Sequence, residues 1–214
     1  PAAPLPDANP AHALCFSIPM NTPGLTLLCR DSVSLPDNRF DHPLSSRFDE
    51  QDAFVIFDDV EVPRDRLFID GNLDVYNSVV RTTWWPNIMQ QTMIRAQVKL
   101  EFAWGLATVM TEAIGSATPP VHQMLGEIWT FAALARAAIR AAETDARDPG
   151  NGMWYCDVEP LMALRTALPR WFPRVNEIIR ELGAHNLLTT PSTEQFADPG
   201  LRGLLDRYLG GAGG

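Results

Sequence analysis

The chain has 214 residues, of which 46% are hydrophobic and 20% are charged, a composition typical of a folded globular protein. The formal net charge of -9 argues against nucleic acid or an anionic membrane surface as a partner, because each would repel the chain. No apolar run approaches the ~20 residues that a bilayer-spanning helix needs, and no signal-peptide pattern is present. We therefore expect a cytoplasmic protein with no membrane partner.

The first predicted elements are two short strands within residues 12–20 and 24–30, which flank the turn "NTPG". Pro23 fixes its own φ and Gly24 tolerates positive φ, so the backbone is expected to bend sharply here. Asn21 and Thr22 would then project from the bend, where a cleft could receive them. A simple connecting loop is the alternative.

The run "AFVIF", residues 53–57, is continuous and rich in β-forming residues, which predicts a strand buried on both faces. The segment "VEV" predicts a second strand piece that Pro63 ends, because proline cannot donate to a sheet. Asp58 and Asp59 would lie between the two pieces, at a turn or bulge where carboxylates accept backbone N–H bonds. We favour this structural role over paired acid and base chemistry, which needs a cleft.

Beyond about residue 78 the apolar residues recur at helical spacing. The first helix is predicted to follow Pro86 and to end near Gly115. It carries two apolar stripes, which is typical of a helix inside a bundle. One stripe is formed by Met89, Met93, Ala96, Leu100, Ala103, Ala107, Met110 and Ile114, and the other by Ile94, Val98, Phe102, Gly105 and Val109.

Gln90 and Gln91 interrupt the apolar positions of this helix. A buried amide must find hydrogen-bond partners. These partners are either neighbouring residues of the bundle or a ligand, and the pattern leaves both open.

Three further helices are predicted. One runs from Pro119 or Pro120 until "DPGNG" stops it at 148–152, and a short last helix covers 200–209. Between them, a helical region begins at about 159, is kinked or broken by Pro169 and Pro173, and is capped by Gly183. The order of elements predicts an α+β fold, and helices apolar on two faces indicate an oligomer.

The common catalytic motifs are absent: there is no glycine-rich phosphate loop, no GxSxG and no HExxH. The cysteines form no CxxC pair and have no histidine at metal-site spacing, so we expect buried, reduced thiols and no metal ligands. His185 follows a helix end, where an imidazole either interacts with the last carbonyls or has a function.

Five stretches of the chain resemble one family. They are "SIPMNTPGL", "FDHPLSSRFDEQDAFVIFDDVEVPRDRLF", "MTEAIG", "PRVNEIIRELGAHNLLTTPS" and "LLDRYLGGA". In this order they resemble the 4-hydroxyphenylacetate 3-monooxygenase family, the oxygenase components of two-component, FADH2-dependent aromatic hydroxylases. The resemblance covers almost the whole chain.

The resemblance implies an acyl-CoA-dehydrogenase-like fold, in which an N-terminal helical domain, a middle β-barrel and a C-terminal helical bundle assemble into a homotetramer. Residues 1–78 would be the C-terminal part of the barrel, and residues 79–214 the first part of the antiparallel bundle. The chain would then be a fragment of a longer protein, without the N-terminal helical domain and the closing helices.

The implied activity is hydroxylation of a phenolic substrate ortho to its hydroxyl through a flavin C4a-hydroperoxide, with FADH2 supplied by a separate flavin reductase. The phenol could be free or tethered to a carrier protein. Asn21 and Thr22 match a turn beside the flavin ring and the substrate, and Gln90 and Gln91 would contact substrate and cofactor respectively. The positions that match a turn near the adenine of a neighbouring subunit's FAD are Gly183, Ala184, His185 and Asn186.

Gln90 departs from the family pattern, because several relatives have a histidine there that is implicated as a base. An amide cannot act as a base near pH 7, so deprotonation of the phenol would fall to the missing domain or be unnecessary, and the sequence identifies no catalytic residue. A less favoured alternative, a 4-hydroxybutyryl-CoA dehydratase, would need a histidine and a cysteine on this helix, and no cysteine occurs between Cys29 and Cys156. Another alternative is a non-catalytic piece whose bundle mediates assembly.

Overall fold

The computed structural model describes residues 9–32, 39–79, 82 and 84–210. By its contacts the chain divides into two units. The β unit comprises residues 1–80 and 192–198, and the helical unit comprises residues 81–191 and 199–214.

The β unit contains strands and short helices. The strands are β1 (Leu14–Phe16), β2 (Leu25–Cys29), β3 (Ala53–Phe57) and β4 (Leu67–Asp70), and the helices are α1 (Ser45–Phe48), α2 (Leu73–Val79) and α7 (Thr193–Ala197), with 3-10 turns at Pro10–His12 and Arg64–Arg66. The strands predicted within 12–20, within 24–30 and at 53–57 are confirmed. The piece predicted at 60–62 is wrong, because these residues form no strand.

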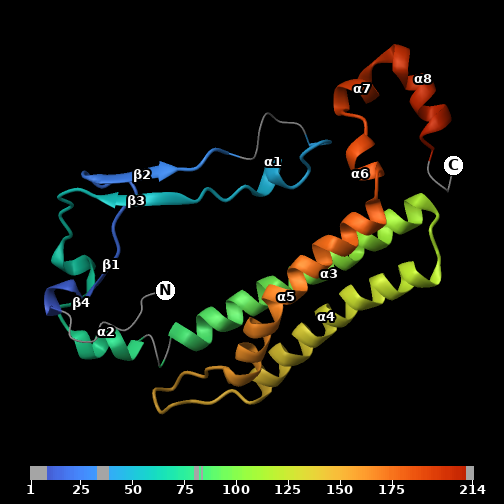
Figure 1. Ribbon diagram of the computed structural model, residues 1–214. Coiled ribbons are helices and arrows are strands. Elements are labelled where there is room, and N and C mark those ends of the chain that lie inside the picture. The colour runs from blue at the N-terminus through green and yellow to red at the C-terminus, as the bar shows by residue number, and fades with distance from the viewer. Residues whose placement is uncertain (1–8, 33–38, 80–81, 83, 211–214) are drawn as a thin grey trace. The chain divides into compact units, whose positions relative to one another are not determined.

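The strands pair as two antiparallel, two-stranded sheets, β1 with β4 and β2 with β3 (Figure 1). In the second sheet Leu25 lies opposite Phe57 and Cys29 lies opposite Ala53. The rings of Phe16 and Phe57 meet edge to face, with centroids 5.8 Å apart, so they join the two sheets.

The expectation that 53–57 is buried on both faces is wrong. Phe54 is 72% exposed and Phe57 is 54% exposed. The reason is that β3 pairs with β2 alone among the described residues, so neighbouring strands that would extend this two-stranded sheet are not present there. The run of apolar residues correctly predicts a strand, but not what covers it.

The helical unit is built on three long helices, α3 (Trp85–Ile114), α4 (Pro119–Thr144) and α5 (Glu159–Gly183). They pack side by side (Figure 1). The short α6 (Asn186–Thr189) follows α5, and α8 (Pro199–Tyr208) is the last helix of the described residues. The predicted helices at 86–115 and 200–209 are therefore confirmed within a residue.

The bundle core comes from one face of each long helix. The side chains that form it are Met89, Met93, Ala96, Leu100, Ala103, Ala107, Ile128, Ala132, Ala135, Ile139, Ala142, Leu161, Leu164, Leu168, Val175 and Ile178. The second stripe of α3 is not buried in the described chain, since Val98 is 56% and Val109 is 62% exposed. The prediction of a helix buried on two sides is thus wrong for this chain by itself.

The ends of the long helices differ from prediction in two places. α4 ends at Thr144, before the predicted stop at 148–152. α5 runs through Pro169 and Pro173 as one helix, so it is not broken there, whereas the kink at these prolines stays a prediction. Both prolines are exposed. A proline has no N–H for the carbonyl one helical turn before it, but on the solvent side of a packed helix that carbonyl can accept a hydrogen bond from water instead.

One expectation about side chains is also corrected. Cys15 and Cys29 are exposed and Cys156 is half-buried, because both strand thiols lie on sheets that the described residues do not cover.

Among the described residues, no helix combines the length and the apolarity that crossing a membrane requires.

Candidate functional site

The turn that carries Asn21 and Thr22 is fixed by its own hydrogen bonds. The backbone N–H of Thr22 and its Oγ1 hydroxyl both donate to the carbonyl oxygen of Pro19, at 3.1 and 2.7 Å. The N–H of Leu25 then donates to the carbonyl of Thr22 at 3.1 Å, which leads the chain into β2. The side chain of Asn21 is exposed. The predicted sharp bend is therefore present.

Gly24 locks this turn against the end of β3. Its φ is +81°, and a Cβ at this position would lie 2.3 Å from the carbonyl oxygen of Asp58. The carbonyl of Gly24 accepts the N–H of Asp58 at 3.0 Å. Only glycine combines this left-handed backbone with so close an approach.

Asp58 and Asp59 thus lie next to the Asn21–Thr22 turn, at the edge where β2 begins and β3 ends. Asp59 has a φ of 52°, a conformation that aspartate tolerates better than most residues. Both side chains are exposed, and within the described residues neither carboxylate accepts the backbone N–H bonds that we expected. The role of Asp58 in the turn is played by its backbone.

Gln90 finds a partner inside the bundle. Its Nε2 donates to Oε1 of Glu143, near the end of α4, at 2.9 Å, and the side chain is half-buried. Gln91 is exposed, so the expectation of a buried amide is wrong for it. A helix places adjacent residues about 100° apart, and one of the pair consequently faces outward.

The turn after α5 contains Gly183, Ala184, His185 and Asn186. Gly183 is the last helical residue and is buried, and a Cβ there would lie 2.4 Å from Cγ of Leu187. The positive φ of 44° belongs instead to Ala184, whose N–H donates to the carbonyl of Arg180 at 2.8 Å. The predicted cap at Gly183 is therefore wrong: the glycine is needed for close packing, and the residue after it ends the helix.

His185 and Asn186 are exposed and lie at the start of α6. The carbonyl of His185 accepts the N–H of Leu188 at 2.9 Å, and that of Asn186 accepts Oγ1 of Thr190 at 2.7 Å. The His185 imidazole makes no hydrogen bond to the carbonyls of α5 in the described residues. Both side chains remain available to a ligand.

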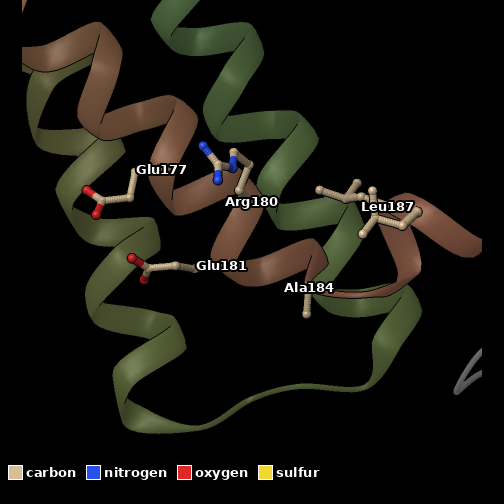
Figure 2. Close-up of a pocket in the computed structure, with 6 residues that line it drawn as sticks. Glu177, Arg180, Glu181, Ala184 and Leu187 are labelled. Carbon is tan, nitrogen blue, oxygen red and sulfur yellow. The ribbon is translucent and has the colours of Figure 1, made fainter.

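A hollow of about 540 Å³ opens beside this turn (Figure 2). It is lined by Glu177, Arg180, Glu181, Ala184, Leu187 and Leu188. Arg180 was not among the predicted site residues. The signal that could have found it is its position, one helical turn before Gly183 and Ala184 in "RELGAHN".

The predicted site residues form three separate groups. Gln90 bonds to the last turn of α4, whereas Arg174 near the end of α5 bonds to Glu127 near the start of α4, at 3.1 Å. At ~1.5 Å per residue, the 25-residue α5 spans about 37 Å, so Gln90 and Gly183 lie at opposite ends of the bundle. Asn21 and Thr22 belong to the β unit. Among the described residues, no cluster of histidine, cysteine, aspartate and glutamate has the composition to hold a metal ion.

The chain matches two family models along its length. They are "4-hydroxyphenylacetate 3-hydroxylase N terminal" over residues 1–69 and "4-hydroxyphenylacetate 3-hydroxylase C terminal" over residues 77–214. The chain is 37% identical to the 4-hydroxyphenylacetate 3-monooxygenase oxygenase component of Thermus thermophilus over 99% of its own length and 44% of that protein. It thus spans less than half of this relative.

Solved structures of the same family are also similar to the chain. The oxygenase component HpaB of 4-hydroxyphenylacetate 3-monooxygenase, complexed with FAD and 4-hydroxyphenylacetate, is similar with a TM-score of 0.91 and 36% identity, over 99% of this chain and 45% of that one. An archaeal 4-hydroxybutyryl-CoA dehydratase from N. maritimus has a TM-score of 0.82 at 17% identity, over 94% of this chain and 41% of that one. The second likeness shows a shared fold.

Proposed function

Because the chain belongs to the 4-hydroxyphenylacetate 3-hydroxylase family, we propose that it acts in the oxygenase component of a two-component aromatic monooxygenase. The proposed reaction adds one oxygen atom to a phenol, ortho to its hydroxyl, with FADH2 from a separate flavin reductase. The observation that carries the proposal is the similarity to the FAD-bound and substrate-bound oxygenase over nearly the whole chain, which includes all three groups of predicted site residues.

In this proposal the three groups have different tasks. FADH2, when bound, supplies the activation of O2. The fixed turn presents the side-chain amide of Asn21 and the side chain of Thr22 to the flavin ring and the phenol. Gln90 and Gln91 provide further polar contacts to substrate and cofactor. Gly183, His185 and Asn186 contact the adenine end. Since Gln90 and Gly183 lie at opposite ends of one bundle, a cofactor that touches both groups would join two copies of the chain.

The residues at the turn after α5 fit a dinucleotide in their chemistry. The hollow offers a guanidinium, two carboxylates and an apolar wall of Ala184, Leu187 and Leu188. A phosphate, ribose hydroxyls and a flat base are the complementary groups. Gln90 is an amide, so it can hold the phenol but cannot remove its proton near neutral pH.

We also propose the wider architecture. The exposed faces of β3 support the view that residues 1–78 are part of a β-barrel completed by other chain segments, and the exposed stripe of α3 supports a homotetramer built on residues 79–214. We therefore propose an acyl-CoA-dehydrogenase-like assembly in the cytoplasm. Its phenol would be free or bound to a carrier protein.

The test supplies the protein with FADH2 from a flavin reductase, O2 and 4-hydroxyphenylacetate, and measures the catechol product by liquid chromatography and mass spectrometry. We expect product that disappears when flavin is withheld. Asn21→Ala should lower the rate about tenfold or more, since a hydrogen bond to a reacting group is worth about 1.5 kcal/mol or more. Thr26→Ala, an exposed strand residue nearby, is the matched control. Equal product with and without flavin would refute the proposal.

A second candidate is a non-catalytic scaffold, which the exposed stripe of α3 also favours. It predicts a stable oligomer in analytical ultracentrifugation with no affinity for FAD. The dehydratase alternative stays unsupported, because α3 carries neither histidine nor cysteine and the likeness to that enzyme extends to the fold alone.

A further inference from the structure

The middle of the bundle carries positive charge in a chain whose formal net charge is -9. Residues 89–100 of α3 and residues 160–176 of α5 contain lysine and arginine but no aspartate or glutamate. The two helices pack side by side (Figure 1). A local excess of one charge on an otherwise acidic protein attracts ligands of the opposite charge.

Two of these cations, Arg95 and Lys99, have no partner in the part of the chain that the structure describes. Both side chains are exposed, and neither makes an ion pair or a hydrogen bond there. By contrast, Arg174 of α5 binds Glu127 at 3.1 Å. Arg95 and Lys99 lie one helical turn apart on α3, where like charges destabilise a helix. An anion bound between them would offset this repulsion.

The two cations border one hollow of about 270 Å³ between α3 and α5. It is lined by Thr92, Arg95, Ala96, Lys99, Leu168 and Phe172. Ala96 and Leu168 belong to the buried core of the bundle, and the half-buried Phe172 packs against that core. The hollow therefore combines an apolar floor, which the core holds in place, with two exposed positive charges.

A small inorganic anion would use only the charged part of this hollow. The planar fork of a guanidinium and the three donors of an ammonium group together suit the two oxygens of a carboxylate. The apolar floor suits an aromatic ring, which can pack on the ring of Phe172. The volume of about 270 Å³ lies just below the range of pockets for drug-sized ligands, so a ligand with a single ring is the best match.

We propose that this hollow binds a small aromatic carboxylate, with the carboxylate between Arg95 and Lys99 and the ring against Leu168 and Phe172. The binding does not involve Gln90, because at about 100° per residue Lys99 lies about 180° around α3 from it. It also needs no flavin. The inference therefore goes beyond the proposed function and does not rest on it, so that either can fail alone.

Lys99 is the only lysine of the chain, which gives the hollow its own spectroscopic probe. Reductive methylation with ¹³C-formaldehyde labels Lys99 and the N-terminal amine and keeps the positive charge. The NMR signal that is missing from labelled Lys99→Arg is the signal of Lys99. Phenylacetate is titrated into the labelled protein, and phenylacetamide, acetate and inorganic phosphate are titrated separately as probes that lack either the charge or the ring.

Calorimetry measures the same four titrations on the unlabelled wild type and on Arg95→Gln, Lys99→Gln and Arg170→Gln. Arg170 is a matched control, since it is exposed on α5 and lies outside the hollow. Circular dichroism confirms that each variant is folded.

Phenylacetate should shift the Lys99 signal and bind with a Kd on the order of 1 mM, as expected for a ligand of this size. The three other probes should bind about tenfold more weakly or less, because each lacks one half of the interaction. Arg95→Gln and Lys99→Gln should each weaken phenylacetate about tenfold, the effect of one lost charged hydrogen bond. Arg170→Gln should match the wild type.

A Lys99 signal that phenylacetate does not shift would overturn the proposal, and so would equal phenylacetate affinities in Arg95→Gln and Arg170→Gln. Acetate or phosphate binding as tight as phenylacetate would overturn the contact of the ring with Phe172. If Arg95→Gln and Lys99→Gln instead changed the oligomeric state in analytical ultracentrifugation and left phenylacetate binding unchanged, the two cations would serve a contact between copies of the chain, and the proposal would be wrong.

Discussion

The helical unit buries one face of each long helix in a continuous core, whereas no apolar side chain on the described strands of the β unit is fully buried. Apart from Ala13, the buried apolar residues of the described chain all lie on α3, α4 and α5. In the β unit, the chain is instead held by hydrogen-bonded turns, by the approach of Gly24 to Asp58 and by the contacts of α7. The helical unit is thus stabilised by packing and the β unit by backbone geometry. Mutations that remove buried side chains should therefore destabilise the first, and mutations that change backbone conformation should destabilise the second.

The largest effect is expected from a cavity in the bundle. Ile128 is fully buried, with 0% of its surface exposed, and Ile128→Ala should lower the free energy of unfolding by about 2–5 kcal/mol. Urea unfolding followed by helical circular dichroism measures this. Val98→Ala, at a side chain 56% exposed, should cost less than about 1 kcal/mol. Similar losses in both variants would mean that the core is not where the bundle gains its stability.

Gly24→Ala tests the backbone-held unit. The new Cβ would meet the carbonyl oxygen of Asp58 at 2.3 Å, and the φ of +81° is strained for alanine, so the cost should exceed about 1 kcal/mol. Hydrogen exchange with mass spectrometry should show faster exchange in β2 and β3 and no change in the bundle.

The matched control is Gly126→Ala in α4, where nothing lies within 4 Å of an added Cβ. There the change should stabilise the helix by about 0.5–1 kcal/mol. If Gly24→Ala left exchange in β2 and β3 as slow as in the wild type, the turn would not be locked in solution.

Asp41→Ala should release α7 from the β unit. The Asp41 carboxylate accepts the hydroxyl of Thr193 at 2.9 Å and its backbone N–H at 3.3 Å, and Phe40 packs on Phe196 with ring centroids 5.3 Å apart. The loss of these bonds should cost about 1 kcal/mol and be visible as faster exchange in 192–198. Asp41→Asn keeps one acceptor oxygen and should restore part of the protection. Equal exchange in all three proteins would contradict the role given to Asp41.

The smallest effect concerns pH and the surface of the bundle. Hydrogen bonds from Arg136 and then Gln97 lower the pKa of Glu101 below its ordinary 4.5. The stabilisation is therefore present above pH 4.5 and is lost as pH falls through the lowered pKa. Glu101→Gln should flatten this acid limb of the stability curve by less than about 1 kcal/mol, because the pair is exposed. Glu112→Gln on the same helix should leave the loss of stability at acid pH unchanged. If Glu101→Gln also left it unchanged, the role given to Glu101 would be refuted.

The sequence predicts most of the helical unit because its information is local. The spacing of Met89, Met93 and Leu100 defines the buried face of α3, and Gly115 ends it with a φ of +71°. α7 carries a local signal as well, because Ser192 and Gln195 form a capping box with the expected spacing.

What could not be predicted depends on contacts between distant residues. The exposure of β3 depends on how many strands pair around it, which a run of apolar residues does not reveal. The candidate site shows the same limit. The resemblance locates the turn at Gly183, but Arg180 is recognisable as free only once Arg174 is seen to bind Glu127, 47 positions away along the chain. The continuity of α5 through Pro169 and Pro173 likewise follows from the packing of the helix against α3 and α4.

The position of α7 along the chain has a genetic consequence. Residues 192–198 belong to the β unit, yet residues on both sides of them belong to the helical unit. A single crossover between two related genes near codon 80 would combine a β unit from one parent with an α7 from the other. Asp41 and Thr193 would then have to match across the junction. Recombination at this boundary should therefore succeed best between parents that share both residues.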